Sequence, residues 1–315
     1  MRITKDKITV IGAGLVGSTS VYAMMNAGIA SEIVLIDVNQ KRLSGEVMDL
    51  NHGSSFVPQV RVRAGDYPDC ADSSIVVITA GVSQKPGESR LDLLKRNVEV
   101  FRSIVPNIMR HNDFPLILVV TNPVDLLTLV TLKLSELPPH RVIGSGTVLD
   151  SSRFRYLLSE HFNVSAQNVH AYIVGEHGDS EVPTWSLTNI AGISIEDYCR
   201  TCEKSENCVE RERIFNEVKN SAYVIIEGKG ATYYAVGLAV RRICEVILRN
   251  EHAILPVSSL IDGLYGIKDV ALSLPAILDS QGVQKVLELP LTPEEIAGLR
   301  ASANTLKSVF RELGF

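Results

Sequence analysis

The sequence predicts an α/β protein, in which a doubly wound parallel sheet over residues 1–147 precedes a mixed α+β domain over residues 148–315. Short apolar runs alternate with helical segments through the first half, which is the pattern of a parallel sheet covered on both faces. A glycine-rich turn follows the first of these runs. After residue 149 the alternation gives way to longer helical patterns and to strands joined by turns. A length of 315 residues is enough for two domains of ordinary size.

The first part contains apolar runs of strand length that are bounded by polar or turn-forming residues. These runs cover residues 8–11, 33–36, 75–79, 116–120 and 142–144. Helical segments lie between them. Residues 15–26 form one such segment, and residues 126–134 form another, whose many leucines predict burial on most sides.

The second part begins with a predicted helix over residues 151–162, followed by an apolar strand at residues 171–174. A helix comes next, and its apolar residues recur on one face: Ile214, Phe215, Val218, Ala222, Ile225 and Ile226. The Gly-Lys-Gly segment at 228–230 ends this helix before a second helix at 233–248.

The C-terminal segment predicts antiparallel strands and a final helix. The run that ends near Ile261 and the strands at 270–278 and 283–289 are connected by turns at residues 262–263 and 279–282. The last helix starts at a Thr292 N-cap, followed by Pro293 at its first position and by Glu295, which closes a capping box.

Composition and charge exclude several classes of function. The chain is 45% apolar and 21% charged, as in an ordinary globular protein. A net charge of -5 and a pI of about 5.8 argue against nucleic-acid or anionic-membrane partners. We find no apolar run long enough to span a bilayer and no secretory signal at the N-terminus. Because the cysteines number five, an odd count, we expect a reducing cytoplasm and no disulfide framework.

Cys199, Cys202 and Cys208 lie close together in a polar segment. Thiols at this spacing suggest zinc, but a fourth ligand and a second Cys-x-x-Cys pair are missing nearby. We therefore predict no metal site and expect a surface loop or helix there, with its role left open.

A G-x-G-x-x-G motif at Gly12, Gly14 and Gly17 follows the first strand and opens the first helix. In this context the glycines permit a tight turn and bring a pyrophosphate close to the free N–H groups of the helix. Asp37 ends the next strand, where a carboxylate accepts hydrogen bonds from ribose hydroxyls and repels a 2′-phosphate. The segment predicts a Rossmann-type site for NAD, although the nearby Arg42 keeps NADP open and Asp37 alone is also compatible with a turn cap.

His177 lies in a tight loop, Gly-Glu-His-Gly-Asp at 175–179, directly after an apolar run. Histidine gives and takes protons near neutral pH, and a redox enzyme needs such a group beside its hydride carrier. A structural histidine in a turn is the alternative.

Five ordered segments together resemble the lactate/malate dehydrogenase family, with the closest likeness to its bacterial NAD-dependent members that act on L-lactate. They are GAGLVG at 12–17, QKPGESR at 84–90, TNPVD at 121–125, LDSSR at 149–153 and GEHGD at 175–179. The resemblance covers essentially the whole chain. It implies reversible hydride transfer between NADH and a 2-oxo acid, at the fermentative end of glycolysis.

The resemblance also assigns roles. His177 is implied as the proton donor and acceptor, Asp150 as the carboxylate that orients it, and Arg153 as the group that grips the substrate carboxylate. Arg90, in a polar loop, is implied to polarise the carbonyl as the loop closes. Asn122 and Thr232 are implied as substrate contacts, although either is also compatible with a chain-end cap. An N-terminal helix acid is the alternative for Asp150, and a surface arginine is the alternative for Arg153.

Further positions match residues that contact the cofactor in the family, although their residue types alone do not indicate that role. Together with the glycines, Asp37, Arg42 and Asn122, the implied cofactor residues are Val16, Tyr67, Gly81, Val82, Ser103, Val120 and Ser145.

Gln84 separates the two commonest substrates of the family. In the malate branch this position is typically an arginine that pairs with the second carboxylate of oxaloacetate. A neutral amide leaves that carboxylate unpaired, which costs several kcal/mol and gives discrimination of about a hundredfold or more. We therefore predict pyruvate and lactate as substrates. The alternatives are malate or broad 2-hydroxy-acid dehydrogenase activity, or a non-enzymatic NAD-binding relative, for which a lost His, Arg or Asp is expected.

Arg155 and His170 match positions that bind fructose 1,6-bisphosphate between subunits in activated bacterial members of the family. Two ordinary surface residues are the alternative. The resemblance implies a homotetramer, but no feature of the sequence counts the subunits.

Overall fold

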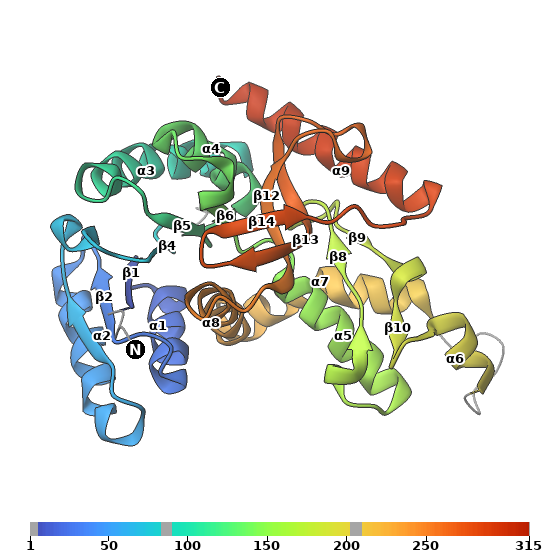
Figure 1. The fold of residues 1–315 in the computed structure, drawn as a ribbon, viewed down its shortest axis with the longest axis horizontal. Coiled ribbons are helices and arrows are strands. Elements are labelled where there is room, and N and C mark those ends of the chain that lie inside the picture. The colour runs from blue at the N-terminus through green and yellow to red at the C-terminus, as the bar shows by residue number, and fades with distance from the viewer. Residues whose placement is uncertain (1–5, 83–89, 202–209, 315) are drawn as a thin grey trace.

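The computed structural model describes residues 6–82, 90–201 and 210–314, and a nine-stranded sheet forms its centre (Figure 1). The strand order is β14-β13-β12-β6-β5-β4-β1-β2-β3. The parallel part comprises β1 (Lys7–Ile11), β2 (Glu32–Ile36), β3 (Arg61–Ala64), β4 (Ile75–Ile78), β5 (Leu116–Val119) and β6 (Val142–Gly144). The five strands expected in this half are confirmed, and β3 is an additional one.

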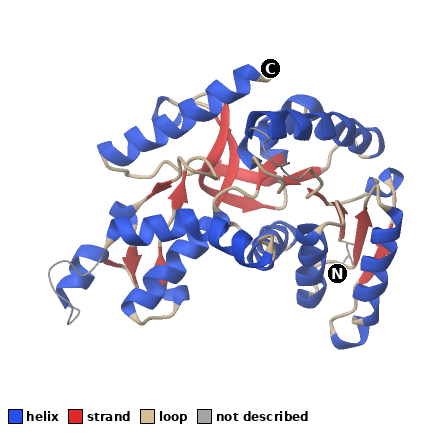
Figure 2. Ribbon diagram, turned by 180° about the vertical axis from the view of Figure 1, so that it is seen from behind, coloured by secondary structure: helices blue, strands red, loops and turns tan. Residues whose placement is uncertain are grey.

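Both faces of the parallel sheet are covered by helices, as the continuous apolar strands predicted (Figure 2). One face carries α1 (Leu15–Ala27), α2 (Gln40–His52) and α8 (Tyr234–Leu248). The other face carries α3 (Arg90–His111), α4 (Val124–Ser135) and α9 (Pro293–Glu312).

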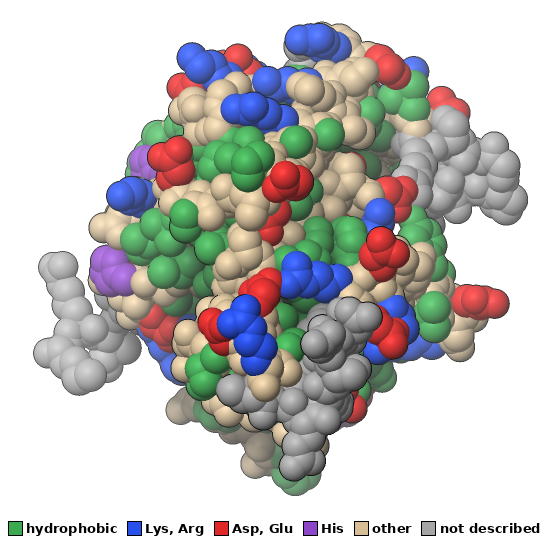
Figure 3. Space-filling model, turned by 90° about the vertical axis from the view of Figure 1, so that its right-hand side faces the viewer, with side chains coloured by type: hydrophobic (Ala, Val, Ile, Leu, Met, Phe, Trp, Pro, Cys, Tyr) green, Lys and Arg blue, Asp and Glu red, His purple; other side chains and the backbone are tan. Residues whose placement is uncertain are grey.

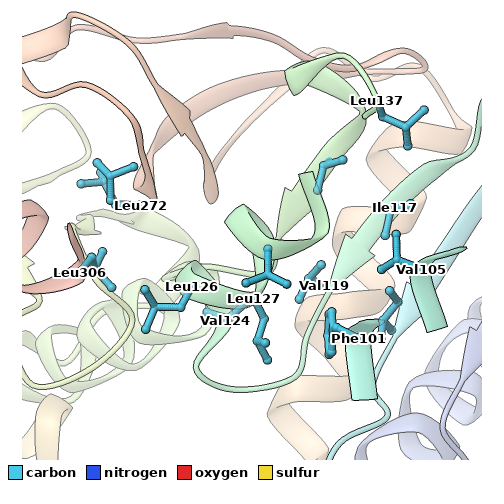
Figure 4. Packing of buried hydrophobic residues seen from close by; sticks show 14 of the residues in the cluster. Phe101, Val105, Ile117, Val119, Val124, Leu126, Leu127, Leu137, Leu272 and Leu306 are labelled. Atoms are coloured by element: carbon cyan, nitrogen blue, oxygen red, sulfur yellow. The ribbon is translucent and has the colours of Figure 1, made fainter. Parts of the chain in front are cut away.

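Successive residues of a strand serve the two faces in turn, because side chains alternate along β-structure. In β4, Ile75 and Val77 pack with the first set of helices, and Val76 and Ile78 pack with the second. Figure 4 shows the second core, where Leu126 and Leu127 of α4 lie among side chains of β5, α3 and the C-terminal segment. The leucine-rich helix expected around residues 126–134 is therefore buried on most sides, as predicted.

The C-terminal strands extend the parallel sheet, so strands from both predicted domains belong to one sheet. β12 (Ala253–Ile261), β13 (Val270–Asp279) and β14 (Gly282–Val286) are antiparallel, as expected. β12 joins the edge of β6 through the pairing of Ser258 with Gly144. The partners are distant in sequence, so no local pattern indicates the junction. One sheet thus crosses the point where the chain passes from its first part to its second.

Two small sheets and three helices complete the second part. The sheets contain β7 (Val169–His170), β10 (Asn189–Ile190) and β11 (Ile193–Ser194), and β8 (Ile173–Val174) with β9 (Val182–Pro183). The helices are α5 (Val148–Phe162), α6 (Ile195–Thr201) and α7 (Arg211–Lys229). The α6 end of the molecule carries interspersed acidic, basic and apolar side chains (Figure 3).

Of three predictions about helices, one is confirmed, one differs from the structure in where the helix begins, and one holds only in part. The capping box of α9 is confirmed, with reciprocal hydrogen bonds between Thr292 and Glu295. The helix expected from residue 151 begins earlier, at Val148. The apolar face of α7 is only partly buried, because Ile214 and Val218 are covered while Ile226 is 47% exposed. No helix in the described part of the chain is long and apolar enough to cross a membrane.

Candidate active site

His177 lies in the loop between β8 and β9, and the loop is fixed to three other elements. The backbone of Gly175 exchanges two hydrogen bonds with Ser273 of β13. The N–H of Glu176 donates to the hydroxyl of Ser302 in α9 over 2.7 Å. The N–H of His177 donates to the carboxylate of Asp125 in α4 over 2.7 Å. These contacts fix the backbone that presents the imidazole.

Asp150 joins the imidazole to a guanidinium. His177 Nδ1 lies 2.5 Å from Asp150 Oδ2, and Arg153 Nη1 donates to Asp150 Oδ1 over 2.8 Å. The early start of α5 places Asp150 in the first turn of that helix, with Arg153 one turn further on. The Asp150 side chain is only 3% exposed, whereas those of His177 and Arg153 are 24% and 13% exposed. The structure therefore brings these three predicted residues together.

The pair of His177 and Asp150 favours the charged form of both groups. Burial lowers the pKa of His177, but the charge and hydrogen bond of Asp150, with Asp125 and Glu181, raise it to about 9. For Asp150, burial is opposed by His177 and Arg153, which hold the pKa of the carboxyl below its usual value. An imidazolium at neutral pH is the form that donates a proton.

The sequence reasoning did not single out Asp125, although it lies in the quoted segment 121–125. This carboxyl is buried, accepting from the backbone of His177 through one oxygen and from the Ser258 hydroxyl, 2.5 Å away, through the other. Burial raises the pKa of Asp125 to about 6, against the effect of these hydrogen bonds. An acid in the first turn of an otherwise apolar helix was the signal that could have indicated it.

Glu181, at the far end of the His177 loop, is a second carboxyl that the sequence reasoning missed. Its side chain is buried, and burial together with the charge of Asp150 raises its pKa to about 8. The sequence offers little sign of this, because a glutamate two residues after a Gly-Asp turn is ordinarily exposed to solvent.

A cavity of about 560 Å³ lies along the edge of the sheet where its parallel strands end. Eight of the predicted cofactor residues line it: Gly12, Gly14, Asp37, Arg42, Tyr67, Gly81, Val82 and Ser103. Asp37 accepts hydrogen bonds from the backbone N–H groups of Ala13 and Asn39, each over 2.7 Å. The carboxylate is thereby fixed beside the glycine-rich turn.

The backbone at the glycine-rich turn fits a dinucleotide. A Cβ on Gly12 would lie 2.6 Å from the backbone nitrogen of Ala80, and one on Gly17 would lie 1.8 Å from the oxygen of Gly12. Gly17 therefore serves the packing of the turn, which explains why it does not line the cavity. Because the N-cap of α1 is Gly14, no side chain caps the start of this helix, and its first N–H groups can donate to a phosphate.

The other predicted cofactor residues lie outside this cavity. Val120 and Ser145 follow the parallel strands β5 and β6, and Asn122 comes directly after Val120. Carboxyl ends of parallel strands share one edge, so these residues continue the row that begins at Asp37 and Gly12. Val16 lies half-buried on α1.

Asn97 of α3 is a further residue that the sequence reasoning missed. Its side chain accepts from the N–H of Val82 over 2.8 Å and donates to the oxygen of Asn122 over 3.1 Å. It thereby connects the segments that follow β4 and β5, on which predicted cofactor and substrate residues lie.

Some predicted residues cannot be placed in the site. Gln84 lies outside the described residues, as do Cys202 and Cys208, and the backbone of Arg90 begins α3. Thr232 lies half-buried in the link between α7 and α8. Arg155 donates from Nε to the oxygen of Ala171 over 2.9 Å, next to the exposed His170. Among residues 6–82, 90–201 and 210–314, no group of three or more His, Cys, Asp or Glu side chains could hold a metal ion.

Comparison with known proteins assigns this arrangement to a family. Residues 6–144 match the family description "lactate/malate dehydrogenase, NAD binding domain", and residues 147–313 match "lactate/malate dehydrogenase, alpha/beta C-terminal domain". The chain belongs to the lactate/malate dehydrogenase family. The cavity with Asp37 and the glycine turn accordingly lies in the NAD-binding domain of the family, and the fold class expected from the sequence is confirmed.

Individual family members match along nearly the whole chain. An L-lactate dehydrogenase of Acetivibrio thermocellus is 59% identical over 307 residues, covering 98% of this chain and 97% of the relative. L-lactate dehydrogenase 1 of Clostridium acetobutylicum is 57% identical over 302 residues, covering 96% of each chain. The crystal structure of a minor L-lactate dehydrogenase from Enterococcus mundtii, in a ligand-bound form, matches with a TM-score of 0.94 at 43% identity and covers 98% of each chain.

Proposed function

We propose that this family member is an NAD-dependent L-lactate dehydrogenase, an oxidoreductase that interconverts pyruvate and L-lactate. The observation that carries the proposal is the hydrogen-bonded series His177–Asp150–Arg153. An imidazole and a guanidinium share one buried acid, which supports roles as proton donor and carboxylate-binding cation, in a chain 59% identical to a named L-lactate dehydrogenase. A catalytically inactive relative would be expected to lack at least one of the three.

Reduction of pyruvate adds a hydride to the carbonyl carbon and a proton to the carbonyl oxygen. NADH, when bound, supplies the hydride. His177 donates the proton from its imidazolium, and in the reverse direction it takes the proton from the lactate hydroxyl. Asp150 holds the imidazole through Nδ1, which leaves Nε2 to face the substrate and stabilises the positive charge.

Arg153 binds the substrate carboxylate. One of its guanidinium nitrogens donates to Asp150, and a guanidinium has further N–H donors in its planar fork. Arg90 polarises the substrate carbonyl, while Asn122 and Thr232 complete the pocket. Residues 1–147 thus bind NAD, and residues 148–315 supply the acid/base residue His177 and the carboxylate-binding residue Arg153.

Gln84 makes pyruvate the preferred substrate over oxaloacetate, because a neutral amide leaves a second carboxylate without a cation. The test is NADH consumption with each 2-oxo acid, in the wild-type protein and in Gln84→Arg. We expect the wild type to prefer pyruvate and Gln84→Arg to shift the kcat/KM ratio toward oxaloacetate by about a hundredfold. Preference of the wild type for oxaloacetate would instead support malate dehydrogenase, and an unchanged ratio in the variant would remove Gln84 from the specificity argument.

Assembly and regulation extend the proposal. The neighbouring helices α1 and α8 leave Tyr22, Tyr234 and Leu238 more than half exposed, which supports burial of these faces in a homotetramer. Arg155 supplies the guanidinium, and the nearby strand residue His170 the imidazole, for a fructose 1,6-bisphosphate site. A sedimentation measurement of mass tests the assembly.

We place the enzyme in the cytoplasm. Two described cysteines, Cys70 and Cys244, are unpaired and buried. Burial raises the pKa of their thiols to about 11 and about 12, so both stay protonated, and free thiols are typical of proteins in a reducing compartment.

A further inference from the structure

The buried carboxyl of Glu181 lies at the end of the His177 loop, and one of its oxygens has no hydrogen-bond partner among the described residues. The residue is 6% exposed, and Oε1 has no hydrogen-bond partner in the described part of the chain. Its backbone N–H donates to the oxygen of Gly178 over 3.2 Å, which fixes it at the end of the His177 loop. A buried carboxylate is normally paired, so a neutral carboxyl is the form that this environment favours.

Charged groups from three elements face Glu181. They are Asp150 and Arg153 on α5, His177 on its own loop, and Lys219 on α7. Burial and Asp150 favour the neutral carboxyl, whereas His177, Arg153 and Lys219 favour the carboxylate, and the pKa of Glu181 is raised to about 8. His177 in turn faces Asp125 of α4 as well as Asp150 and Glu181. Glu181 and the imidazole therefore influence each other's charge.

The charge of the site depends on Glu181. With imidazolium, guanidinium and the Asp150 carboxylate in place, a neutral Glu181 leaves one net positive charge among these groups. An ionised Glu181 cancels it. A 2-oxo acid such as pyruvate is a monoanion. When Glu181 is neutral, the net positive charge of the site attracts this anion. When Glu181 is ionised, the site has no net charge and contains an additional buried anion.

We propose that Glu181 is a positioning residue that must carry a proton for the anionic substrate to bind tightly, and whose ionisation weakens that binding at alkaline pH. This inference rests on the proposed dehydrogenase function. Glu181 acts through Arg153 and His177, and its proton is not consumed, because the proton that reaches the carbonyl oxygen comes from His177. The site thus loses activity in two deprotonation steps as the pH rises, one at Glu181 and one at His177.

The test uses Glu181→Gln, which resembles the neutral carboxyl in shape and cannot ionise. We expect log(kcat/KM) for pyruvate in the wild type to begin to fall near pH 8 and to fall more steeply than one decade per pH unit above about pH 9, where both groups ionise. In Glu181→Gln the slope should be one, and the fall should begin at the lower pKa that His177 has without an anionic neighbour. Near pH 7 the two proteins should agree within about threefold.

Two further variants control this experiment. Glu160→Gln removes an exposed glutamate from α5 and should retain the steep wild-type slope. Glu181→Asp keeps an ionisable group and should also retain it. If Glu181→Gln fails to fold, its circular dichroism spectrum will show the loss of structure. The slopes of the wild type and of Glu181→Asp then decide the question, because a slope of one in both would overturn the role of Glu181.

A binding measurement gives a second readout. When oxamate, the amide isostere of pyruvate, binds to the NADH complex of the wild type near pH 8, the protein should take up protons from solution, and this uptake should be smaller in Glu181→Gln. A slope of one in both wild type and variant, with equal proton uptake, would overturn the role of Glu181. Absence of pyruvate turnover in the wild type at pH 7 would instead overturn the proposed function, so the two failures are distinguishable.

Discussion

The cavity lined by Asp37 and the glycine-rich turn, the cofactor groove, differs from the site around His177 in the kinds of contact that form it. The groove is lined by segments that follow neighbouring parallel strands and by part of α3, and it contains one fixed carboxylate, Asp37. The candidate active site brings His177, Asp150 and Asp125 together from three separate elements and buries the two carboxyl groups against the imidazole loop. The groove is therefore defined mainly by its lining and one fixed charge, whereas the state of the site around His177 depends on proton occupancy and on the neighbouring charges.

The largest expected effect separates the two regions. His177→Asn removes the proton donor and should lower kcat by roughly 10²–10⁴-fold. NADH binding, followed by the fluorescence of the cofactor, should survive, because the groove does not depend on the imidazole. Turnover close to that of the wild type would exclude His177 from the mechanism, and loss of NADH affinity would mean that the two regions are not independent.

The reverse experiment alters the groove. Asp37→Asn removes the charge that accepts the N–H groups of Ala13 and Asn39. The Asp37 carboxylate is also the expected acceptor of the ribose hydroxyls of NADH, and charge-assisted hydrogen bonds contribute about 1.5–3 kcal/mol, so NADH affinity should fall by about tenfold to a hundredfold. The pH dependence of kcat at saturating NADH should stay as in the wild type, and a shifted profile would show that the regions are electrostatically coupled.

The smallest expected effect concerns the effector. Fructose 1,6-bisphosphate should lower the pyruvate concentration for half-saturation by about fivefold or more, and Arg155→Gln should remove that shift. Arg155→Lys keeps the positive charge and serves as the matched control. Saturation curves that do not respond to the sugar bisphosphate in the wild type would end the proposal of an effector site.

Much of the groove could be predicted because its determinants are local. The strand at residues 8–11, the glycines and Asp37 form one continuous pattern, and a parallel sheet necessarily brings its strand ends to one edge. The same holds for the α9 capping box, where Thr292 and Glu295 are three residues apart. Local hydrogen bonds and side-chain periodicity leave a direct trace in the sequence.

The catalytic site could be predicted only in part. The resemblance to a known family named His177, Asp150 and Arg153, but neither resemblance nor pattern indicated Asp125 beneath the loop or Glu181 beside it. Their chemistry depends on burial, which is decided by the packing of α4, α5 and α7 around the loop. The exposure of Ile226 has the same origin, because the periodicity of α7 gives a face but not what covers it.

The sequence by itself determined the alternation of strands and helices in the first part, the glycine-rich turn and, through the family resemblance, the candidates for the proton donor and the carboxylate-binding group. The tertiary structure alone decided that β12 continues the sheet at β6, and that three carboxyl groups are buried around one imidazole. The reason is that backbone patterns follow from neighbours in the chain, whereas desolvation and charge coupling arise between residues that only folding brings together.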